Sequence, residues 1–331
     1  MALTLTARRT TAAAAAGLAG ALVLAGCANP SEGGTTEVAA TPGGKSTIRI
    51  NTSPDQERVR TGKVDSIAAQ VPERIRKRGT LELVASAGSA APLTFHATDN
   101  KTVIGVEPDL AHLVADVLGL KPHINTVSWE NIFVGLDSGK YDAGLSNITV
   151  TEERKEKYDF ATYREDNLGF EAKKGSGLKV TGPEDLAGRT VAVSSGTNQE
   201  KLLVEWSKEN EKAGREPVDI KYYQNDSDTY LALQSGRIDL YLGPNPTAAY
   251  HAATTGRTEV VGTYSGAGAT LQGLIAATTK KDSGLVEPLA DALNHIIDNG
   301  TYAKVLQRWG LSDEAVTESQ INPPGLPRTN K

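Results

Sequence analysis

The sequence is poor in the residues that build disulfides and metal centres. It has one cysteine, Cys27, among 331 residues, so no disulfide can form within the chain. Its five histidines are scattered, which argues against a Cys/His metal cluster. It also lacks a basic stripe and an acidic tail, because both signs of charge are mixed along a chain of formal net charge -5. We therefore expect no metal, no cofactor and no nucleic-acid partner.

The sequence has an apolar run near its start, but the run is too short to cross a membrane. Arg8 and Arg9 precede the apolar, small-residue stretch Thr10 to Ala25, whereas a membrane span takes about 20 residues. The stretch leads into Leu24-Ala25-Gly26-Cys27, which resembles the bacterial lipobox, in which the cysteine is lipidated and becomes the new N-terminus. We therefore predict a lipoprotein signal peptide over residues 1–27, with lipid attachment at Cys27. A plain secretory signal, or twin-arginine export through Arg8-Arg9, is the alternative.

Both flanks of the remaining chain are predicted to be loose. Asn29 to Lys45 is rich in Gly, Pro, Ser and Thr and cannot bury enough apolar surface to fold, so residues 28–63 are expected to form a flexible tether. Asn322 to Pro327 contains three prolines and will not support a helix, so residues 313–331 are expected to form a disordered tail. The length of the chain and its apolar content of 39% suffice for about two domains between them.

The body of the chain, from about Val64 to Leu311, alternates strand-like and helix-like patterns, which predicts an α/β fold with crossover helices. The segments with strand character are Leu81–Ser86, His123–Val127, Ala143–Leu145, Thr190–Val193, Ile220–Tyr223, Leu240–Leu242 and Leu274–Thr278. The segments with helical periodicity or capping signals are Pro108–Leu118, Asn131–Ser138, Thr197–Lys212, Thr229–Gln234, Leu285–Asp298 and Thr301–Trp309.

Seven sequence blocks, in a fixed order, together carry a family resemblance. They are Ile75–Leu81, Gly105–Ala111, Leu136–Ala143 with Asn147–Arg154, Tyr158–Ala161, Glu184–Val193, Gln234–Asp239, and Asp298–Lys304 with Trp309-Gly310. Over roughly residues 72 to 312 the chain resembles the family 3 solute-binding proteins of polar amino-acid ABC importers.

The resemblance implies a two-lobed periplasmic-binding-protein-like fold (type II), with two crossover hinge strands and a ligand cleft between the lobes. Lobe 1 would take residues 64–165 and 272–312, and lobe 2 residues 166–271. It further implies a monomer that captures a small carboxylate-bearing solute, an amino acid or a derivative, and delivers it to an ABC permease. The predicted lipid anchor would hold the protein on the extracytoplasmic side of the cell membrane.

The resemblance also implies which residues bind the ligand's carboxylate. Arg154 matches the family's carboxylate-binding arginine, and a guanidinium offers the rigid fork that a carboxylate needs. The alternative is an exposed ion pair of Arg154 with a neighbouring glutamate. Thr149 either contacts the ligand or caps the next helix, and Thr197 faces the same choice in lobe 2. The complete expected set is Arg154, Thr149, Ser146, Asn147, Thr197, Asn198 and, less directly, Asn245 in a rigid loop between two prolines.

The sequence departs from the family where the ligand's amine would bind. The expected acid falls near Ala87, the expected aromatic near Ala90, and a second expected acid at Pro244 or Asn245. A buried ammonium without a nearby anion is costly. Either neutral oxygens and water hold the amine, or the ligand is not an ordinary α-amino acid.

Two functions from other classes remain open. A cyclohexadienyl dehydratase of this fold would need a general acid or base, but the cleft segments offer no histidine and no carboxylate except Glu107. A ligand-sensing lipoprotein would use the same lobes to contact a receptor instead of a permease. Four aromatic residues either line the cleft or pack in the core: Trp129, Phe95, Tyr163 and Tyr241.

Overall fold

The computed structural model describes residues 35–39, 47–86, 91–223 and 225–328 of the chain. The predicted signal peptide, Cys27 and residues 28–34 and 40–46 of the predicted tether lie outside these residues, as do Ala87 and Ala90. None of the helices in the described ranges combines the length and the apolar character that crossing a bilayer takes.

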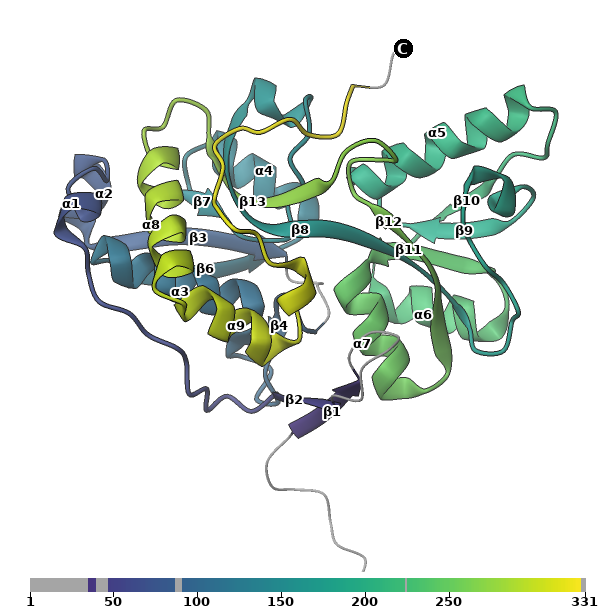
Figure 1. Ribbon diagram of the computed structural model, residues 1–331, viewed down its shortest axis with the longest axis horizontal. Helices are drawn as coiled ribbons and strands as arrows, with labels where there is room; N and C mark the ends of the chain where they lie inside the picture. Colours follow the sequence, from purple (N-terminus) through teal and green to yellow (C-terminus); the bar gives the residue numbers. More distant parts are fainter. Residues whose placement is uncertain (1–34, 40–46, 87–90, 224, 329–331) are drawn as a thin grey trace, which may run out of the picture. The chain divides into compact units, whose positions relative to one another are not determined.

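One mixed sheet organises the fold, with strands in the order β10-β9-β11-β8-β13-β7-β3-β6 and with β12 also paired to β8 (Figure 1). The strands are β3 Thr80–Ser86, β6 Lys121–Val127, β7 Ala143–Gly144, β8 Tyr158–Lys173, β9 Thr190–Val193, β10 Asp219–Tyr222, β11 Leu240–Pro244, β12 Thr258–Ser265 and β13 Gly273–Lys280. The 16-residue β8 joins two halves, because it pairs first with β13 and then, from Asn167 onward, with β12 and β11. All seven predicted strand segments are confirmed.

The first half is built on β3, with β6 and β7 parallel to it and β13 antiparallel to β7 and β8. Its helices are α1 Asp65–Ala68, α2 Glu73–Arg78, α3 Val106–Leu118, α4 Trp129–Asp137, α8 Val286–Asp298 and α9 Thr301–Trp309. On α3, the apolar residues Leu110, Leu113 and Val117 are buried as their spacing predicts, and the left-handed Gly119 ends the helix. They pack in one core with residues of α8 and α9.

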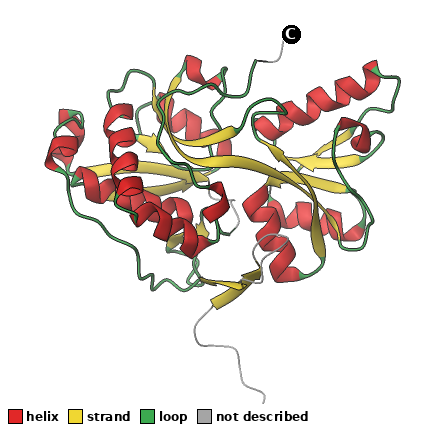
Figure 2. Cartoon of the chain, in the orientation of Figure 1, coloured by secondary structure: helices red, strands yellow, loops and turns green. Residues whose placement is uncertain are grey.

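The second half contains β9, which is parallel to both β10 and β11, and the helices that flank these strands (Figure 2). Those helices are α5 Asn198–Lys212, α6 Asp226–Ser235 and α7 Asn245–Thr255. Its core is separate from that of the first half and includes Phe170, Leu203 and Trp206. Trp206 stacks on Phe170 with ring centroids 5.7 Å apart. Each half therefore has its own hydrophobic core, and β8 is common to both.

Short elements complete the described fold. The strands β1 Thr35–Ala39 and β2 Thr47–Asn51 form an antiparallel pair, and so do β4 Phe95–His96 and β5 Val103–Ile104. Three 3₁₀ turns are η1 Arg154–Glu156, η2 Pro183–Leu186 and η3 Ser312–Glu314.

The structure corrects the prediction of a disordered tail over residues 313–331. Residues 312–328 run beside β8 and the loop that precedes it: Thr162 N–H donates to the Gln320 carbonyl at 3.1 Å, and Leu326 N–H donates to the Val150 carbonyl at 3.0 Å. Glu314 of the same segment forms an ion pair with the buried Arg164 of β8. Proline excludes a helix here but not an extended segment, whose remaining backbone groups pair with a neighbouring strand.

Two smaller predictions are also wrong. Residues 50–63 of the expected flexible tether pack on the first half, where Ile50 is buried and Arg58 pairs with Asp109. Asn245 begins α7 rather than lying in a rigid loop, because Pro246 occupies the first helical turn, where a missing N–H leaves no intrahelical bond unmade. α7 and β12 were not predicted.

Candidate functional site

A cavity of about 410 Å³ lies between the two halves, beside the carboxyl ends of strands β3, β9 and β11. The first half contributes Ser86, Leu93, Ser128, Trp129, Glu130, Ser146 and Asn147. The second half contributes Ser194, Ser195, Thr197, Gln199, Tyr222, Tyr223, Asn225, Asp226, Thr229, Tyr241, Leu242, Gly243, Pro244 and Thr247. The volume and the mixture of hydroxyl, amide and aromatic groups suit a small polar organic ligand.

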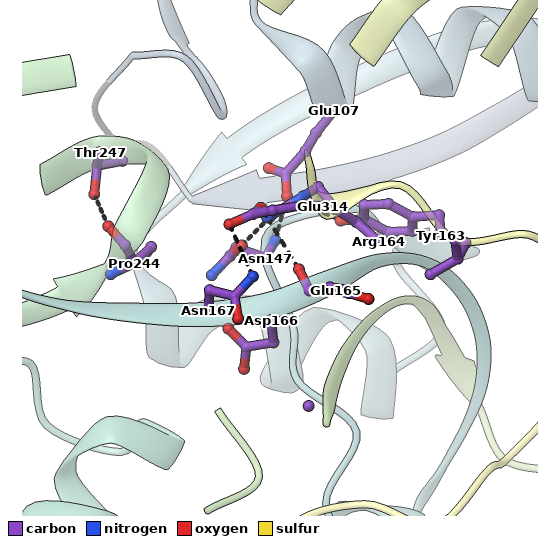
Figure 3. Close-up of polar contacts among 12 residues, drawn as sticks. Glu107, Asn147, Tyr163, Arg164, Glu165, Asp166, Asn167, Pro244, Thr247 and Glu314 are labelled. Carbon is purple, nitrogen blue, oxygen red and sulfur yellow. Dashed lines mark hydrogen bonds and ion pairs between the residues drawn. The ribbon is translucent and has the colours of Figure 1, made fainter. Parts of the chain in front are cut away.

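A buried polar network holds the first-half wall of the cavity in place. Asn147 has a φ of 50°, and its backbone N–H donates to Glu107 of α3, which is 1% exposed. Glu107 also accepts from the Tyr163 hydroxyl at 2.9 Å, and Arg164 donates to the Asn147 side-chain oxygen (Figure 3). Because Glu107 is saturated with donors, it supports Asn147 instead of facing a ligand.

Ser146 is fixed in a similar way. It is buried beside the cavity, and its hydroxyl accepts from the backbone N–H of Ser86 at 2.7 Å. The two predicted residues Ser146 and Asn147 therefore lie on the cavity wall, each with a determined orientation.

Arg154 lies beside the cavity and links the two halves. Its guanidinium donates to the Thr149 carbonyl at 2.9 Å and to the Gly196 carbonyl of the second half at 3.3 Å. It also faces the rings of Trp129 and Phe133, at 5.4 and 5.3 Å from their centroids. Burial lowers the pKa of Arg154 to about 10, against the attraction of Asp166 and Tyr158, so the group stays cationic at neutral pH.

Thr149 and Asn198 meet at a residue that sequence reasoning missed. The Thr149 hydroxyl donates to the Asp166 carboxylate at 2.7 Å, and the Asn198 amide donates to the same oxygen at 3.1 Å. Burial raises the pKa of Asp166, although both donors and Arg164 oppose the shift. Thr149 and Asn198 thus join the halves through β8 and are not on the cavity wall. The available signal was its position, because Asp166 is an acid at the predicted boundary between lobe 1 and lobe 2.

Thr197 combines the two roles that its motif allows. It is the N-cap of α5, since its hydroxyl accepts from the Glu200 N–H at 3.2 Å, and it also lies on the cavity wall. Glu200 in turn accepts from the Gly196 N–H at 2.6 Å. Asn245, by contrast, is absent from the wall, which its neighbours Pro244 and Thr247 line.

The structure corrects the expectation that the cleft holds no carboxylate except Glu107. Asp226 and Glu130 both lie on the cavity wall, from the first turns of α6 and α4. Burial raises the pKa of Asp226 to about 6. Sequence reasoning missed these residues because each lies at a helix start outside the family motifs.

The predicted aromatic residues divide between wall and core. Trp129 and Tyr241 line the cavity, together with Tyr222 and Tyr223. Tyr163 is buried behind Glu107, and Phe95 packs edge-on against Trp309 with centroids 5.9 Å apart. Within the described ranges, no group of three or more His, Cys, Asp or Glu side chains is arranged to hold a metal ion.

The chain is similar in sequence to proteins of a known family. Residues 83–312 match the family described as bacterial extracellular solute-binding proteins, family 3. The chain is 30% identical over 241 residues to the L-cystine-binding protein TcyJ of Escherichia coli, covering 72% of this chain and 86% of that one. It is 31% identical over 268 residues to the arginine-binding protein ArgT of Corynebacterium glutamicum, covering 80% and 86%.

A solved structure agrees in fold. It is an ancestral amino acid-binding protein described as a precursor of cyclohexadienyl dehydratase, with a TM-score of 0.60 and 29% identity, covering 72% of this chain and 97% of that chain. The predicted α/β, two-lobed periplasmic-binding-protein-like fold is thereby confirmed. The chain belongs to the bacterial extracellular solute-binding proteins of family 3.

Proposed function

We propose that this chain is the solute-binding component of an ABC importer and that it captures an amino acid in the cavity between its two halves. The proposal is supported by the relatives, which are an L-cystine-binding protein and an arginine-binding protein. It treats residues 64–165 with 272–312 as lobe 1 and residues 166–271 as lobe 2, and it takes the protein to act as a monomer.

The observation that carries the proposal is that Arg154 of the first half contacts the N-terminal end of α5, where Thr197 lines the cavity. Arg154 donates to the carbonyl of Gly196, the residue directly before Thr197, which is the N-cap of α5. A carboxylate bound here would accept from the guanidinium and from N–H groups at the start of α5. Both halves would then contact one anion, which couples binding to closure about the two connections between the halves, β8 and the chain from β12 to β13. Ser146, Asn147 and the N-terminal end of α5 would orient the ligand.

The experiment is a thermal-unfolding screen of the purified protein against amino acids, opines, betaines, ectoines and organic acids. A ligand at about 100 times its dissociation constant adds about 2.7 kcal/mol to the free energy of unfolding. For a protein of this size that shifts Tm by roughly 5 to 11 °C. We expect α-amino acids to give the shift and Arg154→Ala to remove it. A panel without any shift, or a shift that Arg154→Ala leaves intact, would contradict the proposed carboxylate site.

We further propose that Cys27 carries a lipid that holds the protein on the extracytoplasmic face of the cell membrane. The lipobox-like sequence that ends at Cys27 supports this. Labelling of cells with a palmitate analogue should mark the wild-type chain, and Cys27→Ser should lose the label and leave the membrane fraction. A wild-type chain that takes up no label would contradict the proposal.

A dehydratase of the cyclohexadienyl type is a second candidate, because one observation favours it. The cavity holds Asp226, whose pKa burial raises to about 6, and a general acid needs a pKa near the working pH. The two relatives that match 72% and 80% of this chain are binding proteins, which favours capture of a solute over its chemical conversion. Incubation with prephenate or arogenate decides the matter: turnover that Asp226→Asn abolishes would establish the enzyme, and its absence would leave capture.

A further inference from the structure

The charged side chains that the described residues place on the cavity wall are all acidic. Glu130 and Asp226 line the cavity, and no lysine, arginine or histidine among the described residues does so. Glu130 is exposed to solvent, whereas Asp226 is half-buried. The wall therefore offers a ligand two carboxylates and no cation of its own, although Arg154 lies beside it.

Asp226 has polar neighbours but no cationic partner in contact. The Tyr241 hydroxyl of β11 is hydrogen-bonded to its carboxylate. The basic side chain whose charge acts on Asp226 is His251 of α7, which is already hydrogen-bonded to the buried Glu171 of β8 and stacks on Tyr230 with centroids 3.5 Å apart. No ion pair within the described ranges includes Asp226. A half-buried carboxylate in this setting is stabilised by a cation that enters the cavity.

Asp226 and Arg154 contact different residues around the cavity. The Arg154 guanidinium donates to the Thr149 and Gly196 carbonyls and faces the Trp129 ring. Asp226 begins α6 on the cavity wall and is hydrogen-bonded to Tyr241 of β11. The ammonium of an α-amino acid is bonded to the same carbon as its carboxylate, so it stays beside a carboxylate held at Arg154. An acid at a separate position faces a group farther along the ligand.

We infer that Asp226 is the counter-charge for a cationic side chain of the ligand, which makes the ligand a basic amino acid. The inference rests on the proposed capture of an amino acid and adds its class. Tyr222, Tyr223 and Tyr241 line the same cavity and supply aromatic faces on which a guanidinium or an ammonium stem packs. The residue lies in lobe 2, so a basic ligand adds a second link between the lobes when it binds.

The test is calorimetric titration of the purified full chain with L-arginine and L-citrulline, which differ mainly in the charge at the end of the side chain. We expect arginine to bind at least about tenfold more tightly than citrulline, which corresponds to about 1.4 kcal/mol. Asp226→Asn should remove this preference without weakening citrulline binding, and Asp226→Glu should keep it. Glu211→Gln is the control, because it removes the charge of an exposed carboxylate of the second half that does not line the cavity.

The outcomes separate the inference from the proposed function. Equal binding of arginine and citrulline to the wild type, or equal weakening of both by Asp226→Asn, overturns the role of Asp226 and leaves amino-acid capture standing. If neither of these nor any other amino acid binds, the proposed function fails and the inference fails with it. Lysine against its neutral analogue norleucine repeats the comparison with an ammonium in place of a guanidinium.

Discussion

Glu314→Gln is the substitution whose consequences can be worked out in most detail. Glu314 lies in the C-terminal segment, beyond the residues that match the family, and pairs with Arg164 of the crossing strand β8 (Figure 3). The side chains of Glu314 and Arg164 are 7% and 1% exposed. Arg164 also donates to Asn147 on the cavity wall. Glutamine keeps the shape of the side chain but removes the charge, so a buried guanidinium is left without its carboxylate.

Removal of one partner of a buried ion pair costs about 3–5 kcal/mol, because the other charge stays buried and uncompensated. That is a large share of a typical stability of about 5–15 kcal/mol. Each kcal/mol lowers Tm by about 2–4 °C in a protein of this size, so we expect Glu314→Gln to unfold roughly 6–20 °C below the wild type. Differential scanning calorimetry of the purified protein measures this directly.

Two further variants sharpen the test. Glu318→Gln changes an exposed glutamate of the same segment and should shift Tm by less than about 2 °C. The double variant Arg164→Met with Glu314→Gln removes both charges and should recover much of the lost stability, yet ligand binding should stay weak because Asn147 has lost its donor. If Glu314→Gln melts within about 1 °C of the wild type, the pair is not buried as described and this reasoning is refuted.

Three other predictions follow from single contacts. Burial raises the pKa of Asp226 to about 6, so its carboxyl stabilises the fold below about pH 4 and loses that contribution as the pH rises through about 6; urea unfolding of Asp226→Asn across this range should be flatter than that of the wild type. A Cβ at Gly266 would lie 1.7 Å from the Asp166 carboxylate, so Gly266→Ala should cost about 1–3 kcal/mol in chemical denaturation, whereas Gly62→Ala, which meets no atom within 4 Å, should cost little. Thr197→Ala removes the N-cap of α5 and should cost about 1 kcal/mol by the same assay, which Thr197→Ser should largely restore.

The sequence predicts those elements whose signal is local. The helix α3 carries buried apolar residues at a helical spacing and ends at Gly119, so pattern and stop signal agree. The helix α7 has no such signal, because Asn245 lies between two prolines and its buried residues are small or polar. The strand β12 is mostly half-buried and shows no clear alternation of buried and exposed residues.

The C-terminal segment shows a second reason why a prediction from the sequence can fail. Its prolines correctly exclude a helix, but its order comes from partners about 150 residues earlier, such as Arg164 and Thr162. Composition reports what a segment can form by itself, and it carries no information on an exposed strand edge elsewhere in the fold.

The residues of the candidate site fall into the same two groups, those that a local sequence pattern predicts and those that only the fold brings together. Asn147 lies within a family block, Ser146 directly before it and Thr197 four residues after another block, and all three are on the cavity wall. Asp166 and Asp226 depend on how β8, α5 and α6 come together, which one sequence does not reveal. The missing acids at Ala87 and Pro244 could be read from the sequence, but the acid that faces the cavity instead could not.

The most direct test of the proposed capture is a crystal structure of the protein with the amino acid that gives the largest thermal shift. We predict that the ligand occupies the cavity between the two halves, with its α-carboxylate in contact with the Arg154 guanidinium and with backbone N–H groups at the start of α5. A ligand bound outside this cavity, or bound within it with its carboxylate turned away from Arg154, would contradict the account.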